Sequence, residues 1–367
     1  MKLSISREAL LDPLQLVAGV VERRQTLPIL SNLLLVAEEG VLTITGTDQE
    51  VELSATVTDV EIDESGELTV PARKLMDICK SLAGGATLKL TQESSRLSVV
   101  SGEFRSHLAT LPTIDFPNVE PETGAVALEV PAAILGSLLD KTSFAMAQQD
   151  VRLFFNGVLV ELEQGVIRLV ATNGQRLATS FVEHEVRGDN QRFIVPRKGV
   201  HELMRLLNED SEGDAKLQFS SNHLRAEAAN AVLVTKLIDG SYPDYTRAIP
   251  SGGDKIMVGN RSDIREALNR TSILSNEMYR NVRLQMDAGK LDIHANNPLQ
   301  EEADETVSVE YDGGALEIGF NVGYLLDVLS TMRGDKLKIE FIDDSSACLL
   351  TDPDDRNTSY VVSPMMV

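Results

Sequence analysis

Apolar residues recur in this chain with the spacing of a helix face, three times at a constant interval. Side chains at positions i, i+3, i+4 and i+7 lie on one side of an α-helix, so each run predicts an amphipathic helix with one buried stripe. Each run begins 125 residues after the previous one. The three runs are Leu75, Ile78, Cys79 and Leu82; Val200, Leu203, Met204 and Leu207; and Leu325, Val328, Leu329 and Met332.

A strand pattern repeats in step with these helices. Residues 40–48, 165–173 and 289–297 each begin with a glycine and continue with alternating apolar and polar residues, typical of a half-buried β-strand. An apolar segment precedes each of them, so each pair predicts a hairpin. A further helical stretch opens each unit, near 5–24, 130–148 and 260–274, and a pair of strands closes it.

Four elements that recur in one order three times predict an internally repeated fold. The fold class is therefore α+β, with three tandem copies of one domain in which two helices pack on antiparallel sheet. Segments rich in proline and glycine mark the boundaries. The expected domains are an N-terminal one at 1–125, a central one at 126–252 and a C-terminal one at 253–367.

Charge and composition limit the possible functions. The chain has 367 residues and a formal charge of −22, which argues against a surface that coats nucleic acid or anionic membrane as a whole. The first residues lack the apolar stretch of a signal peptide, and no run is long enough for a membrane span. The two cysteines, Cys79 and Cys348, are far apart, so reduced, packed thiols in a cytoplasmic protein are expected.

Catalytic motifs are missing from the sequence. The five histidines are isolated, neither cysteine lies in a CxxC motif, and no phosphate-binding glycine motif or nucleophile elbow occurs. A non-catalytic protein without cofactor or metal is the resulting prediction.

Two acidic clusters keep an enzymatic alternative open. With Mg²⁺ they would suit a phosphodiesterase, whereas a solvated or partner-facing charge run fits a chain this acidic better. A monomeric peptide-binding scaffold is a third possibility. The clusters are Glu301, Glu302, Asp304 and Glu305, and Asp352, Asp354 and Asp355.

Positive charge is concentrated on the helical segments. The six expected helices carry +5, which leaves −27 on the rest of the chain. If these helices shared one surface, that surface would attract phosphates through Lys and Arg without reading base sequence. Ordinary polar helix faces are the simpler explanation of the charge difference alone.

Several motifs, together with the repeats, resemble the bacterial sliding clamp family, the beta subunit of the DNA polymerase III holoenzyme. The resemblance covers the whole chain, and TNGQRL and the VVSPM ending are its most specific parts. The motifs are LPIL (27–30), VPARK (70–74), QDVR (149–152), ATNGQRLA (171–178), IVPRKGV (194–200), DGSYPDY (239–245) and YVVSPMMV (360–367).

The resemblance implies a clamp-type fold and a head-to-tail homodimer closed into a ring. Helices would line the hole around duplex DNA, which is encircled without sequence preference, and sheets would form the outer wall. A clamp loader would place the ring on DNA. The ring would then tether the replicative polymerase and other replication and repair proteins as a processivity factor.

Three sets of site residues follow from the resemblance. The DNA-facing residues are Arg24, Arg73, Gln149 and Lys198, with Leu153 and Phe154 beside them. Relatives often have tyrosines at these two positions, so the hydroxyl that could donate a hydrogen bond to DNA is missing here. Packing in the core is the alternative for both Leu153 and Phe154.

The second set is a groove between the second and third domains that takes a short client peptide. Methionines and aliphatic walls with a few polar groups suit leucine and aromatic anchors. Its residues are Phe155, Thr172, Gly174, Gln175, Arg176, Leu177, Pro243, Arg247, Asn321, Tyr324, Val361, Val362, Pro364, Met365 and Met366.

The third set closes the ring. A basic end of one chain would meet an acidic end of its partner, and opposite charges favour head-to-tail pairing. The basic end contains Lys74, Arg96, Arg105 and Leu108, and the other end contains Ile273, Leu274, Glu301, Glu302, Asp304 and Glu305.

Overall fold

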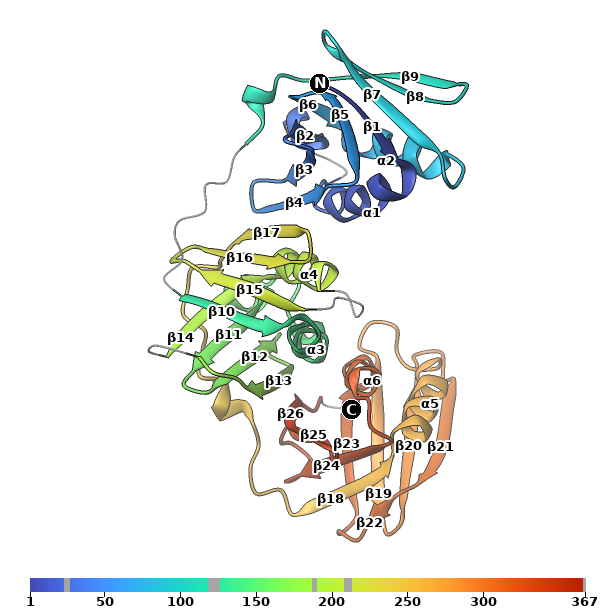
Figure 1. Ribbon diagram of the computed structural model, residues 1–367. Coiled ribbons are helices and arrows are strands. Elements are labelled where there is room, and N and C mark those ends of the chain that lie inside the picture. The colour runs from blue at the N-terminus through green and yellow to red at the C-terminus, as the bar shows by residue number, and fades with distance from the viewer. Residues whose placement is uncertain (23–26, 118–125, 187–189, 208–212, 366–367) are drawn as a thin grey trace. The chain divides into compact units, whose positions relative to one another are not determined.

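The computed structural model describes residues 1–22, 27–117, 126–186, 190–207 and 213–365. The chain forms two compact units, which are described separately. The first consists of Met1–Gly136 and Lys198–Leu237, and the second of Ser137–Arg197 and Ile238–Val367 (Figure 1). Among the described residues, no helix combines the length and the apolar character that crossing a membrane requires.

One succession of elements occurs three times along the chain. A strand and a helix come first, then a run of strands, then a second helix and three more strands. The repeats begin at β1 (Lys2–Ser6), β10 (Val126–Pro131) and β18 (Lys255–Asn260). This confirms the α+β class and the internal repeat. The sequence patterns missed the strand before each opening helix, because five or six strand residues run directly into the helix.

The helices end slightly earlier than their apolar spacing predicts. In α2 (Ala72–Ser81), Leu75 and Cys79 are fully buried, but Leu82 follows the helix with extended backbone. Leu207 and Met332 likewise lie just beyond α4 and α6, yet both are buried. The spacing therefore predicts the buried face correctly and the helix end one residue too late. The remaining helices are α1 (Arg7–Ala18), α3 (Ala132–Thr142), α4 (Arg197–Leu206), α5 (Arg261–Ser272) and α6 (Val322–Thr331).

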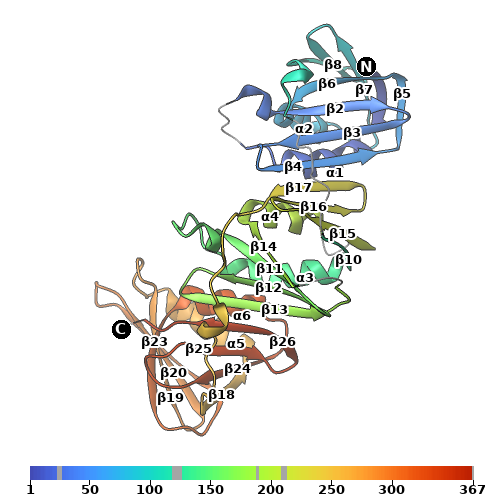
Figure 2. The ribbon, with the colours of Figure 1, turned by 90° about the vertical axis from the view of Figure 1, so that its left-hand side faces the viewer.

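The first unit contains two antiparallel sheets. One has the order β5-β1-β7-β8-β9 and the other β10-β15-β16-β17-β4-β3-β2-β6. Helix α1 packs on α2, β3 and β4 with Leu10, Leu14 and Val17 fully buried (Figure 2). The other elements of the first unit are η1 (Pro28–Ser31), β2 (Asn32–Glu38), β3 (Val41–Thr47), β4 (Val51–Val57), β5 (Val60–Glu64), β6 (Gly66–Pro71), β7 (Thr87–Glu93), β8 (Arg96–Ser101), β9 (Phe104–Ala109), η2 (Thr113–Asp115), β15 (Asp214–Phe219), β16 (His223–Ala228) and β17 (Ala231–Lys236).

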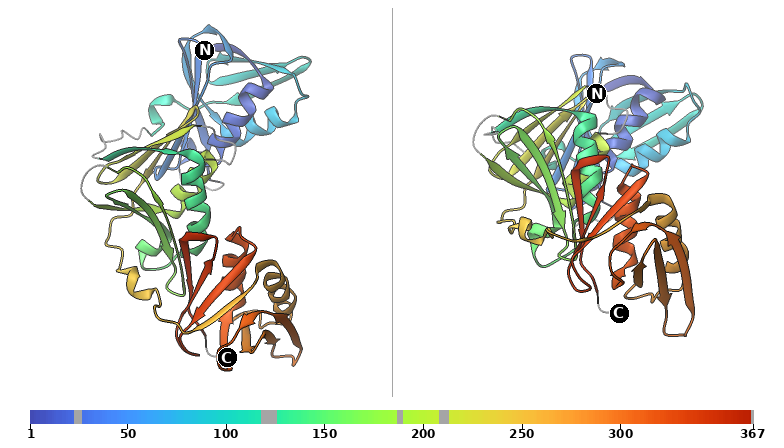
Figure 3. Two further views of the ribbon diagram at one scale, coloured as in Figure 1. Left: turned by 60° about the horizontal axis from the view of Figure 1, so that its bottom comes forward. Right: turned by 90° about the horizontal axis from the view of Figure 1, so that it is seen from below.

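The second unit also contains two antiparallel sheets. Their orders are β14-β11-β12-β13-β26-β25-β24-β18-β22 and β21-β20-β19-β23. Helix α5 packs on α6, β20 and β21 (Figure 3). The other elements of the second unit are η3 (Ser143–Ala145), η4 (Leu153–Asn156), β11 (Gly157–Glu163), β12 (Val166–Thr172), β13 (Arg176–Glu183), β14 (Gln191–Pro196), η5 (Tyr245–Ala248), β19 (Asn281–Asp287), β20 (Lys290–Asn296), β21 (Glu302–Ser308), β22 (Glu310–Tyr311), β23 (Leu316–Asn321), β24 (Lys336–Phe341), β25 (Cys348–Asp352) and β26 (Asp355–Val362).

Both large sheets run across a junction between repeats. In the first unit, β17 of the central repeat pairs with β4 of the N-terminal repeat. In the second unit, β13 pairs with β26, and this register sets Arg176 opposite Val362 and Ser180 opposite Thr358. The second junction therefore brings the TNGQRL motif beside the end of the chain.

Candidate functional site

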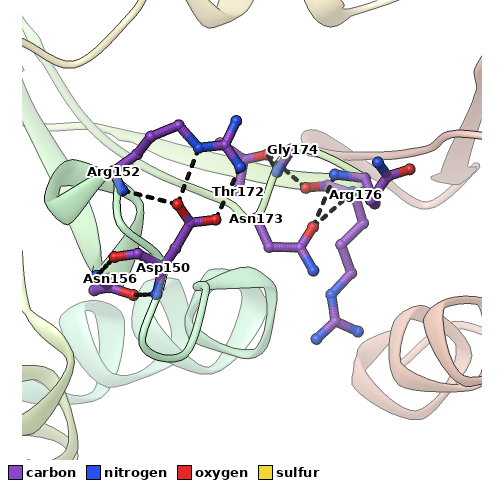
Figure 4. A network of polar contacts seen from close by, with 8 residues as sticks. Asp150, Arg152, Asn156, Thr172, Asn173, Gly174 and Arg176 are labelled. Atoms are coloured by element: carbon purple, nitrogen blue, oxygen red, sulfur yellow. Dashed lines mark hydrogen bonds and ion pairs between the residues drawn. The ribbon is translucent and has the colours of Figure 1, made fainter.

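The TNGQRL motif forms a tight turn between β12 and β13, held by its own side chains (Figure 4). The Thr172 hydroxyl donates to the carbonyl of Arg176 at 2.6 Å and accepts from the backbone of Gly174 at 3.0 Å. Asn173 Oδ1 accepts from the backbone nitrogens of Gln175 and Arg176 at 2.9 and 3.0 Å. Gly174 has a φ of 88°, which a residue with a Cβ rarely adopts. These hydrogen bonds make the TNGQRL turn a rigid wall of the candidate groove.

Arg176 connects this turn to α6. Its guanidinium donates to the carbonyl of Phe144 at 2.5 Å and forms an ion pair with Asp327. The same group lies 4.8 Å from the ring centre of Tyr324, a cation–π distance. The side chain of Arg176 is only 11% exposed, so its main role is structural: it holds Tyr324 in position beside the turn.

The end of the chain lies along the same turn. Ser363 donates its backbone N–H to the carbonyl of Gln175 at 2.8 Å, and Met365 donates to Gly319 in β23 at 2.9 Å. Val361 and Val362 precede this segment in β26; Val361 is 3% exposed and Val362 is fully buried. Val362 therefore supports the wall from below rather than facing a ligand. Met366 lies outside the described residues.

Arg152 and Asp150 lie beside the TNGQRL turn, although they are not among the groove residues that the resemblance predicts. Arg152 grips Asp150 through Nε and Nη2 at 3.0 and 2.8 Å (Figure 4). Its guanidinium lies 4.6 Å from the ring centre of Phe155, and a Cβ on Gly174 would come within 3.3 Å of it. Hydrogen bonds from Arg152 lower the pKa of Asp150 to about 2, so the pair stays ionised at neutral pH. The QDVR motif was the available signal, but only its glutamine was selected.

The floor of the site is an apolar cluster. Phe155, Leu177 and Val361 share it with Tyr242 and Tyr245, which flank the expected groove residue Pro243. Arg247 follows in η5 with its side chain 85% exposed and its Nε 3.0 Å from Asp244. Asn321 caps α6 by accepting from the backbone of Gly323 at 2.9 Å. The expected groove residues that the structure describes all belong to the second unit, and Phe155, Leu177 and Val361 share one apolar cluster there.

Expected DNA-facing residues occur in both units. In the first, Arg73 is exposed at the start of α2. In the second, Gln149 has a left-handed backbone with φ 58°, and Leu153 is 64% exposed, which contradicts the core-packing alternative for Leu153. Phe154 packs edge-on against Phe155 with ring centres 4.7 Å apart, so packing accounts for that residue. Arg24 lies outside the described residues.

Lys198 is not free in the first unit. Its ammonium lies 2.8 Å from a carboxylate oxygen of Glu22 and pairs with Asp48. Burial alone would lower the pKa of Lys198, but the hydrogen bonds to these carboxylates outweigh it and raise the pKa. The lysine is therefore charged and already partly neutralised, which its sequence neighbours did not predict.

The expected ring-closing residues lie on or near edge strands. In the first unit, β9 is an edge strand that carries Arg105 and Leu108 and pairs with β8, where Arg96 begins the strand. Lys74 is exposed on α2 of the same unit. Arg96 and Arg105 are exposed, whereas Leu108 is only 7% exposed. The first unit therefore presents a basic edge.

The corresponding edge of the second unit is β21. Ile273 is 77% exposed, and Leu274 beside it is half-buried. Parts of the acidic run interact within the chain: Glu305 accepts from Arg270 Nε at 3.0 Å, and Asp304 lies 2.7 Å from His294 Nδ1. Asn297 donates to Glu301 at 2.6 Å, while Glu302 is exposed at the start of β21.

The second acidic cluster serves internal contacts. Asp352 accepts from the backbone nitrogens of Gly334 and Asp354 at 2.9 and 3.0 Å, and Asp355 pairs with Lys141 at 2.7 Å. Within the part of the chain that the structure describes, no three His, Cys, Asp or Glu side chains are grouped so as to hold a metal ion. The side chains of Asp352 and Asp355 are therefore engaged in contacts within the chain.

Comparison with known proteins assigns the repeats. Profiles described as the N-terminal, central and C-terminal domains of the DNA polymerase III beta subunit match residues 1–120, 129–244 and 246–366. The beta sliding clamp of Pseudomonas aeruginosa is 51% identical over 366 residues, and that of Escherichia coli K12 is 43% identical over 365 residues. Both alignments cover all of this chain and all of the relative.

Solved structures agree with these matches. The crystal structure of the DNA polymerase III subunit beta from Pseudomonas aeruginosa has a TM-score of 0.95 at 50% identity and full coverage of both chains. A Bartonella birtlesii sliding clamp bound to griselimycin has a TM-score of 0.95 at 36% identity, again with full coverage.

The fold is therefore that of a clamp protein, with three tandem α+β clamp domains in one chain. More particularly, the chain belongs to the DNA polymerase III beta subunit family, the bacterial beta sliding clamps of DNA replication.

Proposed function

We propose that two copies of this chain close head to tail into a ring that encircles duplex DNA and tethers the replicative polymerase and other clients. The observation that carries the proposal is the pair of oppositely charged edge strands. The edge strand β9 carries Arg105 and pairs with β8, which begins with Arg96, and the edge strand β21 begins with Glu302. An open strand edge exposes backbone donors and acceptors that a second strand can complete, and opposite charge selects the head-to-tail partner.

In this ring, the three domains at 1–125, 126–252 and 253–367 of each copy place their helices around the DNA. The excess of positive charge on the helical segments supplies a weak, sequence-independent attraction for phosphates. Arg24, Arg73, Gln149 and Lys198 are the proposed contacts, with exposed Leu153 beside them. Retention on DNA is topological, so this attraction needs little strength.

Clients bind the groove formed by the TNGQRL turn, Pro243, α6 and the end of the chain. Its supports are the apolar floor around Phe155 and Leu177 and the rigid hydrogen-bonded turn. The chain acts without chemistry or cofactor of its own, in the cytoplasm at the chromosome, and an ATP-driven loader opens the ring.

The test of the ring is topological. Labelled protein is loaded onto nicked circular plasmid with its cognate clamp loader and ATP, the complex is isolated, and the plasmid is cut once. We expect retention on the uncut circle and rapid loss after cutting, because a ring slides off a free end. The Pseudomonas aeruginosa clamp, loaded in parallel, shows that the loader is active.

Two results would contradict the proposal. Equal retention on cut and uncut plasmid would mean direct binding of the DNA surface. Failure of this chain to load, while the control clamp loads, would mean that it does not form a loadable ring.

A further inference from the structure

A buried carboxylate lies beneath the groove without belonging to its wall. Glu161 sits in the middle of β11 and is 1% exposed. One of its oxygens, Oε1, lies 2.7 Å from Nη2 of Arg192 in β14. The other, Oε2, lies 3.8 Å from Nε of Arg168 in β12. A carboxylate this deep is stable only with such partners, because desolvation strongly disfavours an isolated buried charge.

The third partner of Glu161 comes from the segment that connects the central and C-terminal repeats. The Tyr245 hydroxyl donates to Glu161 Oε2 at 2.6 Å, and Tyr245 is 8% exposed in the apolar cluster. Burial, helped by the neighbouring Glu161 carboxylate, raises the pKa of Tyr245. The hydroxyl therefore remains a donor at every physiological pH.

Other contacts also hold this segment, since Ile238 and Ile249 at its two ends pack against the apolar cluster. At its start, Ile238 donates its backbone N–H to the carbonyl of Ile194 at 2.9 Å. Tyr242 then packs edge-on against Phe155, with ring centres 5.9 Å apart. Tyr245 begins the short η5 helix, so Pro243 lies between two tyrosine anchors. Arg247 lies within that helix, two residues after the second anchor.

We propose that Glu161 is a positioning residue for the client groove: by holding Tyr245, it fixes the segment from Ile238 to Ile249 and thereby Pro243 and Arg247. This inference rests on the proposed groove. Its physical basis is preorganisation, since a wall that is already in its bound position loses less conformational freedom when a peptide binds. Glu161 itself does not touch the peptide.

The experiment compares two tyrosine hydroxyls in the full-length protein. Tyr245→Phe removes the contact with Glu161 and keeps the ring. Tyr311→Phe is the matched control, because Tyr311 is also buried and donates to the carbonyl of Gly314 at 2.7 Å. Tyr311 lies on β22, which is the edge strand farthest from β11 in the nine-stranded sheet that carries Glu161.

The probe is a fluorescein-labelled synthetic pentapeptide with leucine and phenylalanine anchors, and its Kd is measured by fluorescence anisotropy. We expect Tyr245→Phe to raise the Kd about three- to tenfold and Tyr311→Phe to leave it unchanged. Hydrogen exchange should accelerate at residues 239–249 in Tyr245→Phe but not at α2. Equal Kd values for the two variants would overturn the inference.

Glu161→Gln provides a second route if Tyr245→Phe folds poorly. It keeps the size of the side chain, removes the charge that pairs with Arg192 and Arg168, and leaves a neutral amide oxygen that is a weaker acceptor for the Tyr245 hydroxyl. Where both single variants fold, we expect their combination to have a Kd no higher than that of the weaker-binding single variant, because both changes weaken the same hydrogen bond between Glu161 and Tyr245. Independent, multiplicative losses would contradict a shared role.

A truncation separates this inference from the groove itself. Deleting Met365–Val367 removes groove residues directly and should abolish peptide binding while the dimer persists. If the truncated protein binds as tightly as the full chain, the groove assignment is wrong. If truncation abolishes binding and Tyr245→Phe has no effect, the groove stands and only the role of Glu161 is wrong.

Discussion

At the scale of single residues, the structure changes what Lys198 can do. The resemblance makes it a phosphate contact, yet Glu22 and Asp48 already hold its ammonium. A DNA phosphate must therefore compete with two carboxylates of the same chain. Such competition weakens each contact with DNA, which suits a protein that must slide.

The competition predicts a gain of affinity from a lost charge. Glu22→Gln should strengthen binding to linear duplex DNA about two- to fivefold at low salt and steepen its salt dependence, because Lys198 becomes freer to replace a counterion. Fluorescence anisotropy across a salt series measures both quantities. Glu38→Gln is the control, since Glu38 is exposed at the end of β2 and its loss changes the net charge equally. Identical effects of the two substitutions would show that only net charge matters.

The two cysteines are free and buried, which confirms the expectation of packed thiols. Burial raises the pKa of Cys348 from 9.0 to about 12 and also raises that of Cys79. Both thiols are therefore protonated at pH 8.

We expect neither thiol to react with a disulfide reagent in the native protein at pH 8, and both to react in denaturant. Absorbance of the released chromophore measures the reaction. A thiol that reacts rapidly before unfolding would show that one of these side chains is accessible.

The raised pKa of Cys348 also affects stability at high pH. Between about pH 9 and 12 the unfolded chain binds fewer protons at Cys348 than the folded chain, so this residue makes the free energy of unfolding fall as pH rises.

At the scale of elements, alternation along strands decides which acidic residues are available to a partner. In β21, Glu305 lies on the half-buried face and pairs with Arg270 of α5. Glu302 and Asp304 lie on the exposed face of the strand. The acidic run that looked uniform in the sequence therefore divides between internal pairing and an exposed edge.

Reversing charge on the exposed part should weaken the dimer. Glu301→Lys with Glu302→Lys should raise the dimer Kd about tenfold at about 0.05 M salt and much less at about 0.5 M, because salt screens exposed charges. Sedimentation equilibrium measures the Kd at both salt concentrations. Asp312→Lys with Asp335→Lys is the control, since both residues are exposed in the same unit but lie off β21. A dimer Kd insensitive to the first pair would remove electrostatic ring closure.

At the scale of the whole molecule, the charge of −22 and the excess of positive charge on the helical segments suit a ring with an acidic exterior. Each chain has a mass of 40.1 kDa, so the native particle should have a mass of about 80 kDa. Native mass spectrometry measures this directly. A dominant species near 40 kDa at micromolar concentration would favour a monomeric scaffold over a ring.

The sequence by itself determined the repeated α+β architecture of this protein. Helix spacing and strand alternation are local patterns, and their recurrence at intervals of 124 or 125 residues revealed the repeat without tertiary information. It also determined the TNGQRL turn, whose hydrogen bonds join residues at most four positions apart. The sequence patterns did not reveal the short strands that precede the opening helices, because five or six residues leave little periodicity to detect.

Only the tertiary structure decided which side chains meet across the chain. Glu161 and Tyr245 are 84 positions apart, Lys198 and Asp48 are 150, and Arg176 and Asp327 are 151. Glu161 and Arg176 lie on strands, where a register shift of one residue would turn the side chain to the opposite face, and their partners come from η5 and α6. No local pattern could therefore predict the contact between Glu161 and Tyr245 or the ion pair of Lys198 with Asp48, because folding brings these partners together from distant parts of the chain.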